Sequence, residues 1–224
     1  MLRHKNTNRL YEHWAQKRSH GQPPKRSQIE PSAIATVLAN TALIEKQDTG
    51  AFIFSLAGSR LASIFGYEIT GDLATDIFSV QDHRVINQGF DAVAIEHAAM
   101  IVETAGFTQN GRVVAFENVF LPIIDQRPCL LAAIQNMTTP VWLGSEPVLA
   151  MEVRSLRMMD LDRELFALTN RPAALFPVDR AGPRPFTSLA ANRGEGRFSV
   201  ISGHSKAPRQ PSSAHLHIVD GGKA

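Results

Sequence analysis

The clearest hydrophobic pattern in the chain is a run of β-forming residues that turns at a glycine into a short apolar segment. Phe52–Ala57 is long enough for one strand, and Gly58 is free to take the positive φ angle that would end it. Ser59 can cap a following helix. The apolar residues of that helix fall on one face, namely Leu61, Ile64 and Phe65. Gly66 and Gly71 then predict turns, so the stretch forms one strand-helix-turn unit.

An amphipathic helix is predicted at the start of the chain, over residues 8–19. Its apolar residues share one side, namely Leu10, Tyr11 and Trp14. This aromatic side needs cover, either from the domain's own sheet or from the same helix of a second subunit. Residues 21–26 contain two prolines and predict a linker. Pro31 suits the first turn of a second short helix with apolar Ile34, Val37 and Leu38.

Five segments, including the strand already described, have the length and the pattern of strands, namely 41–45, 51–57, 100–108, 112–121 and 129–137. Asp48 and Gly50 predict a hairpin turn between the first two, and Asn110-Gly111 predicts one between the third and fourth. In the fourth segment both alternating faces are largely apolar, so this strand should be central and covered on both sides. Residues 149–165 are expected to add one more strand or helix.

A longer helix is predicted between the second and third strands. Asp82 is its expected N-cap, and Ile86, Phe90 and Val93 recur on one helical face. His97 falls on the same face, so its side chain is expected to point where the apolar side chains point.

Composition and charge bear on organisation and partners. The chain has 224 residues with 44% hydrophobic and 20% charged, which fits one domain with extensions. Residues 1–30 carry seven Lys/Arg against two Asp/Glu, and residues 171–224 carry eight against three, so the ends are basic and the middle is acidic. Basic ends are usually solvated, and nucleic-acid or membrane binding by them is the disfavoured alternative.

Cysteine usage and hydropathy indicate a compartment. Cys129 is the single cysteine, which excludes an intrachain disulfide and fits a reducing environment. The sequence has no run of 18 apolar residues and no secretory signal at its start. We expect a cytoplasmic protein.

In their order, these motifs resemble those of a PAS domain, specifically a short bacterial family with an N-terminal Tyr-x-x-Trp helix. The matching residues are Tyr11 and Trp14, Ile29-Glu30-Pro31, Leu56-Ala57-Gly58-Ser59-Arg60-Leu61, Phe65-Gly66, Gly71, and Leu121-Pro122. The match covers roughly residues 8–160. The resemblance implies an α+β fold, with a five-stranded antiparallel sheet, helices on one face and frequent dimerisation. It also implies signal sensing or protein contact, and it assigns no ligand or cofactor.

Candidate ligand-binding residues follow from the pattern and the resemblance. His97 is either a haem ligand or, as the ordinary alternative, a helix-end histidine bound to a backbone carbonyl. Glu117 lies in an apolar strand and is either exposed, paired with Arg60, or at a polar cavity. Tyr67 lies at a glycine turn that could face a pocket, although turn chemistry alone explains it.

The core phenylalanines give two opposite expectations. Phe116 is a candidate pocket residue in a ligand-binding domain. In a ligand-free adaptor the same core is instead closed by aromatic side chains, namely Phe54, Phe65, Phe90, Phe116 and Phe120.

Two further candidates have weaker support. Cys129 could be a redox or flavin-reactive thiol, but the flavin-type Asn-Cys-Arg-Phe-Leu-Gln motif is absent, which favours a buried inert thiol. His215-Leu216-His217 offers two imidazoles to a metal, too few for a site, so no metal site is predicted.

The sequence predicts a non-enzymatic regulator. It has no G-x-S-x-G, P-loop, H-E-x-x-H or G-x-G-x-x-G motif in a suitable context. Three segments are expected: a helix and linker over 1–30, a PAS-like domain over 31–165, and a disordered basic tail over 166–224. We expect a sensor without its own output domain, which binds a signalling protein and forms a homodimer. A small-molecule ligand and a ligand-free adaptor role remain the alternatives.

Overall fold

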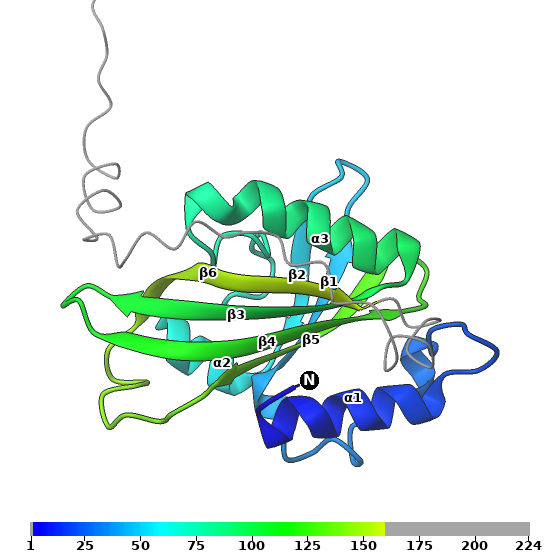
Figure 1. Ribbon diagram of the computed structural model, residues 1–224, viewed down its shortest axis with the longest axis horizontal. Helices are drawn as coiled ribbons and strands as arrows, with labels where there is room; N and C mark the ends of the chain where they lie inside the picture. Colours follow the sequence, from blue (N-terminus) through cyan, green and yellow to red (C-terminus); the bar gives the residue numbers. More distant parts are fainter. Residues whose placement is uncertain (1, 160–224) are drawn as a thin grey trace, which may run out of the picture. The chain divides into compact units, whose positions relative to one another are not determined.

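The computed structural model describes residues 2–159 of the chain (Figure 1). The predicted basic tail, residues 166–224, and the pair His215 and His217 lie outside the described residues.

The described chain forms one antiparallel sheet in the order β2-β1-β5-β4-β3-β6. Its strands are β1 (Thr41–Lys46), β2 (Phe52–Ala57), β3 (Ala99–Thr108), β4 (Val113–Ile123), β5 (Cys129–Asn136) and β6 (Val148–Met159). The predicted five strands are confirmed, and the segment after residue 149 adds a sixth beside β3. As expected from its two apolar faces, β4 is central, lying between β5 and β3.

Both predicted hairpins form, but the second turns differently from the sequence expectation. Gly50 between β1 and β2 has φ 86°, and Gly111 between β3 and β4 has φ 75°. Asn110, expected to share the positive φ, does not have one. Thr108 N instead bonds Arg112 O across a three-residue loop, which needs the left-handed conformation at the glycine alone.

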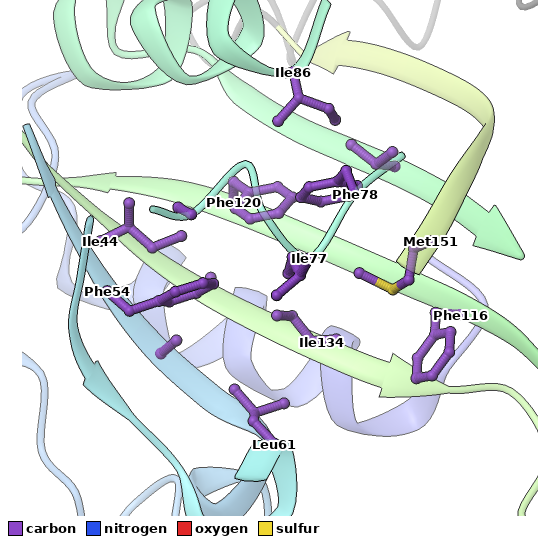
Figure 2. Close-up of a cluster of buried hydrophobic side chains, with 14 of the residues drawn as sticks. Ile44, Phe54, Leu61, Ile77, Phe78, Ile86, Phe116, Phe120, Ile134 and Met151 are labelled. Carbon is purple, nitrogen blue, oxygen red and sulfur yellow. The ribbon is translucent and has the colours of Figure 1, made fainter. Parts of the chain in front are cut away.

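The helices α2 (Ser59–Phe65) and α3 (His83–Glu96) pack on one face of the sheet. Figure 2 shows the apolar cluster at that face, with Phe120 next to Phe78 and with Phe54, Ile44 and Ile134 along the strands. The predicted apolar stripe of α3 is buried, namely Ile86, Phe90 and Val93. Phe90 contacts Phe52 and Phe120 edge to face, with ring centroids 5.4 and 5.0 Å apart.

The glycine before α2 has a different role from the one predicted. Gly58 has φ −71° and is itself the N-cap, while Ser59 is the first helical residue and caps nothing. A Cβ atom on Gly58 would lie 2.4 Å from the Leu38 carbonyl oxygen, so close backbone packing requires the glycine. The prediction of a C′ glycine is confirmed at Gly66, which has φ 81°.

Asp82 precedes α3 as predicted, yet its carboxylate does not cap that helix. Its Oδ2 accepts a hydrogen bond from Val153 N of β6 at 2.9 Å. Burial raises the pKa of the Asp82 carboxyl, and the Val153 amide opposes that shift. Asp82 therefore ties the start of α3 to the sixth strand.

The N-terminal helix α1 (Lys5–Lys17) lies on the opposite side of the sheet from α3 (Figure 1). The expectation of helices on one face therefore holds for α2 and α3, while α1 covers the other face. Residues 31–37, predicted as a helix, form successive turns because most of their backbone bonds span three residues. Ile34 and Val37 are buried as expected, and Leu38 is not. The described chain also contains short 3-10 helices at Arg26–Gln28, Leu38–Asn40 and Val80–Asp82.

Two glycines make a matched test of this packing. A Cβ atom on Gly106 would lie 2.6 Å from Phe116 Cε2 and 2.8 Å from Val148 Cγ1. We expect Gly106→Ala to lower the free energy of unfolding by about 1–3 kcal/mol, because that site is already full. Gly89→Ala meets the flexible end of Met100 at 2.3 Å and gains helix propensity, so it should cost less than about 1 kcal/mol. Urea unfolding followed by circular dichroism compares the two, and equal losses would contradict this account.

Candidate functional site

The candidate site lies between α1 and the face of the sheet that this helix covers. Leu10 and Trp14 are fully buried against the sheet. We call the apolar residues under them the docking face, namely Ile101, Val119, Leu121, Leu131 and Ala133. Of the two expectations for the aromatic side of α1, cover by the domain's own sheet is confirmed. Tyr11, the third predicted residue of this helix, is half-buried at the edge of the same cluster.

Trp14 joins two short motifs that are far apart in the sequence. Its indole Nε1 donates to the Pro122 carbonyl oxygen at 2.7 Å. Its ring stacks on Tyr11, with centroids 5.9 Å apart, and the Arg18 guanidinium lies 5.4 Å from its centroid. The Tyr-x-x-Trp motif and the Leu121-Pro122 motif are therefore the two halves of one contact.

A row of polar side chains crosses the sheet on the same side, under the first turn of α1. We call this set the polar row, namely Gln135 on β5, Glu117 on β4, Glu103 on β3 and Ser155 on β6. Gln135 and Glu117 are 2% and 1% exposed, a depth at which most polar atoms have hydrogen-bond partners, although Gln135 Nε2 has none among the described residues. Gln135 Oε1 accepts from Asn6 Nδ2 of α1 at 3.4 Å.

Glu117 anchors the start of α1 through its carboxylate. It accepts hydrogen bonds from Arg3 N at 2.6 Å, from His4 N at 2.9 Å and from the Thr7 hydroxyl. Two backbone amides and a hydroxyl replace the water that the carboxylate loses on burial, and the positive end of the helix dipole adds to this stabilisation. Of the three expectations for Glu117, exposure and pairing with Arg60 are wrong, because the side chain is buried and its partners are those of the helix start. The third holds in part, since Glu117 lines a small hollow together with polar side chains.

Glu103 neighbours Glu117 across the strand pair but has different partners. Its carboxylate contacts the guanidinium of Arg3 at 3.3 Å and that of Arg157 at 3.2 Å. Two carboxylates side by side repel each other, so the arginines and the helix start together neutralise the row. A hollow of about 150 Å³ lies next to it, with Arg3 and Arg154 on its wall.

Two histidines hold α1 in place, because a ring nitrogen of each accepts a hydrogen bond from a backbone amide. His4 Nδ1 accepts from Asn6 N at 3.1 Å and caps the helix, while His13 Nε2 accepts from Glu30 N at 3.2 Å. Burial lowers the pKa of both imidazoles, and for His4 this outweighs the opposing effect of the Glu117 carboxylate. Both side chains are therefore present as neutral imidazoles.

Of the five candidate ligand residues, Phe116 and Glu117 line the same hollow, and the other three lie apart from it. His97 is exposed, has φ 58° and ends α3, so the prediction that its side chain faces the apolar core is wrong. The helix stops at Glu96, and the left-handed residue after it leaves the helical face. Tyr67 is 50% exposed after α2, and Arg60 lies on α2, whereas Phe116 is 1% exposed within the core.

Cys129 lies at the start of β5 beside two carboxylates. Three side chains each place one atom that could bind a metal ion within 4.8 Å of the others, namely Cys129, Glu45 and Asp125. Arg26 occupies this cluster, contacting Glu45 at 3.2 Å and Asp125 at 3.0 Å. Burial and the two carboxylates raise the pKa of the Cys129 thiol to about 12. A metal ion would have to displace the guanidinium and deprotonate that thiol, so this cluster is a structural ion pair.

The core between the sheet and α3 contains a small polar cluster around Asn118 and Thr104 that the sequence did not predict. Asn118 Nδ2 donates to Val102 O and to Thr104 Oγ1, each at 3.1 Å, and Thr104 Oγ1 donates to Met151 Sδ. The Oδ1 atom of Asn118 is buried without a hydrogen-bond partner among the described residues. The phenylalanines expected to close this core are all buried.

Sequence reasoning also missed the residues that complete the α1 contact, namely Arg3, His4, Thr7, His13 and Gln135. Histidine is not among the usual N-cap residues, so the sequence carries no capping signal at His4. The backbone amides that bind Glu117 carry no signal either, because every residue except proline has one.

Comparison with known proteins agrees with this fold. Residues 2–135 match the family model described as "PAS domain", and the chain belongs to this family. A comparison with curated proteins gives no match. Among solved structures, a variant of RsLOV is similar at 12% identity and a TM-score of 0.35, over 47% of this chain and 66% of that one, just under two thirds of its length.

PAS domains are sensory and regulatory modules, and in these general terms the family membership supports such a role here. Within residues 2–159, every helix is too short or too polar to cross a bilayer.

The anchor at Glu117 can be tested against its neighbour in the polar row. Glu117→Gln turns one acceptor oxygen into a donor that faces donors, so we expect a loss of about 1–3 kcal/mol in the free energy of unfolding. Glu103→Gln removes half-exposed ion pairs and should cost less than about 1 kcal/mol. Hydrogen exchange of the α1 amides should rise in the first variant and change little in the second. Equal effects would argue against a special role for Glu117.

The account of Cys129 predicts an unreactive thiol. With a pKa of about 12 and a buried side chain, only about 1 in 10,000 of the thiols is ionised at pH 8, and reagent access is poor. We expect iodoacetamide to alkylate the native chain at least about 100-fold more slowly than the urea-unfolded chain. Similar rates in the two states would show that β5 opens readily.

Proposed function

We propose that this chain is a regulatory protein of the PAS family that acts by protein contact, with release of α1 from the docking face as the regulated step. One observation carries the proposal: α1 is a separate amphipathic helix packed on the docking face of the sheet. Partner helices bind regulatory proteins in this same way, with apolar anchors on one face. A partner helix with such anchors could replace α1.

The connection between α1 and the sheet supports such a movement. Arg18 caps α1, and the chain then turns through His20 and Gly21, which have φ 52° and 77°. Beyond the turn, Ile124 N donates to Pro24 O and Arg26 N donates to Ile124 O, each at 2.9 Å. The helix can therefore leave as one unit while the linker stays fixed to the end of β4.

The closed inner core favours protein contact over a small-molecule signal. The five phenylalanines that would line a ligand cavity are buried in the apolar cluster between the sheet and α3. Of the five, only Phe116 lines one of the two hollows next to Ile124 and next to Glu117. That hollow, next to Glu117, has a volume of about 150 Å³, below the roughly 300–1,000 Å³ of typical ligand sites. This supports the adaptor alternative over the small-molecule alternative.

A second copy of this chain is the simplest partner, because its α1 fits the same face. Such an exchange would give the homodimer expected from the family resemblance. Nucleic acid is a poorer partner for the N-terminal region, since Arg3, Lys17 and Arg26 already form ion pairs. A single unpaired thiol such as Cys129 suits a cytoplasmic protein.

Removal of residues 1–25 tests the proposal. We expect the shortened chain to self-associate or to bind a partner more tightly, because the docking face becomes exposed. Size-exclusion chromatography with light scattering measures the first, over a range of concentrations. A peptide of residues 2–20 added in trans should restore the original mass, whereas the same peptide with Leu10→Ala and Trp14→Ala should not. An unchanged mass and unchanged partner binding would remove α1 from the mechanism.

A further inference from the structure

His4, the N-cap of α1, and His13, within the helix, each accept a hydrogen bond that can form only when the imidazole is neutral. In both, the donor is a backbone amide, Asn6 N for His4 and Glu30 N for His13. A backbone amide can only donate, so the ring nitrogen facing it must carry a lone pair and not a proton. Protonated imidazole has a proton on both nitrogens and cannot accept either bond. Docked α1 therefore requires both histidines to be neutral.

The two bonds fasten the helix at separate places. His4 caps the first turn, and its own amide binds Glu117, so it connects the helix start to β4. His13 lies one turn from the end of α1 and binds the segment that crosses beneath it at Glu30. Loss of both acceptors would loosen the cap and the far end together.

His83 shows that this arrangement is not general for the histidines of the protein. Its Nε2 contacts the Phe78 carbonyl oxygen at 3.1 Å, and a carbonyl only accepts, so this nitrogen carries the proton. Protonation of the other ring nitrogen leaves that bond intact.

We infer that α1 is released by acid: protonation of His4 and His13 removes both acceptors and frees the helix from the docking face. This inference rests on the proposed function, in which movement of α1 is the regulated step, and it supplies a signal for that movement.

Burial of each ring decides the direction of the effect, against the carboxylates that face it. His4 faces Glu117 of β4 and Lys5 of its own helix, and His13 faces Lys17 of its own helix and Glu30 of the crossing segment. For both rings, burial is the largest influence and lowers the pKa, and the carboxylates oppose it. Docking is therefore complete above the pKa of a free histidine, about 6.5, and weakens as the pH falls below it.

Hydrogen exchange of the α1 amides measures the release. If the freed imidazoles titrate near 6.5, a change from pH 7.5 to 5.5 multiplies the open fraction by up to about tenfold for one histidine and up to about a hundredfold for two. We expect this loss of protection in α1 of the full chain, after each rate is divided by that of an unstructured peptide at the same pH. The amides of β4 should keep their protection, which separates helix release from general acid unfolding.

Two double variants test the assignment to these histidines. In His4→Asn with His13→Gln, the side-chain oxygens take the positions of Nδ1 and Nε2 and accept the same bonds without titrating. We expect α1 to stay docked at pH 7.5 and the acid response to disappear. If this pair does not dock, the single variants serve, and each should retain a response of up to about tenfold.

The matched control uses the two exposed histidines with positive φ, His20 and His97. Asparagine tolerates that conformation, so His20→Asn with His97→Asn should keep the full acid response. An unchanged protection of α1 between pH 7.5 and 5.5, or a full response in the His4 and His13 pair, would overturn the inference. A clear acid release without any change in mass or partner binding would instead overturn the proposed function and leave the histidine contacts standing.

Discussion

The sheet of this protein is apolar on both faces at its centre, and this is the constraint that organises the rest. Strands β4 and β5 bury side chains toward α3 on one side and toward α1 on the other. A sheet with two apolar faces is stable in water only if both are covered. The helices between β2 and β3 cover one face permanently, because they belong to the continuous core. The other face is covered by a helix that precedes the whole sheet in the chain, and we propose that this cover can separate from it.

The polar row explains why that helix sits in one register. Apolar contact alone is non-directional and would let α1 slide along the docking face. A buried carboxylate that needs donors at defined positions does not allow this. Glu117 thus exchanges some stability for specificity, since a well-packed apolar residue would avoid the cost of burying a charge. Because the backbone amide of His4 is one of the donors that Glu117 needs, a change at His4 also disturbs the way in which Glu117 binds the start of α1.

Much of the fold follows from local pattern in the sequence. Alternation and turn residues locate the five core strands, and the apolar stripe locates α3, because these features depend on neighbours in the chain. Predictions failed where a distant backbone decided the outcome: Gly58 is required by the Leu38 carbonyl, and Asp82 binds β6 instead of its own helix. At the candidate site, the apolar half of α1 was predictable from Leu10 and Trp14. The polar half was not, since Glu117 is satisfied by the amides of residues 113 and 114 positions away.

The fixed linker also sets the distance that α1 can travel. Residues 24–26 remain bonded to Ile124, so only the six residues from Arg18 to Pro23 are free to extend. Fully stretched, they reach about 20 Å. A released helix so closely tethered keeps an effective local concentration in the millimolar range. Under the proposed mechanism, any competitor for the docking face must overcome that concentration, so weak or scarce helices would fail and only abundant or tight-binding ones would succeed.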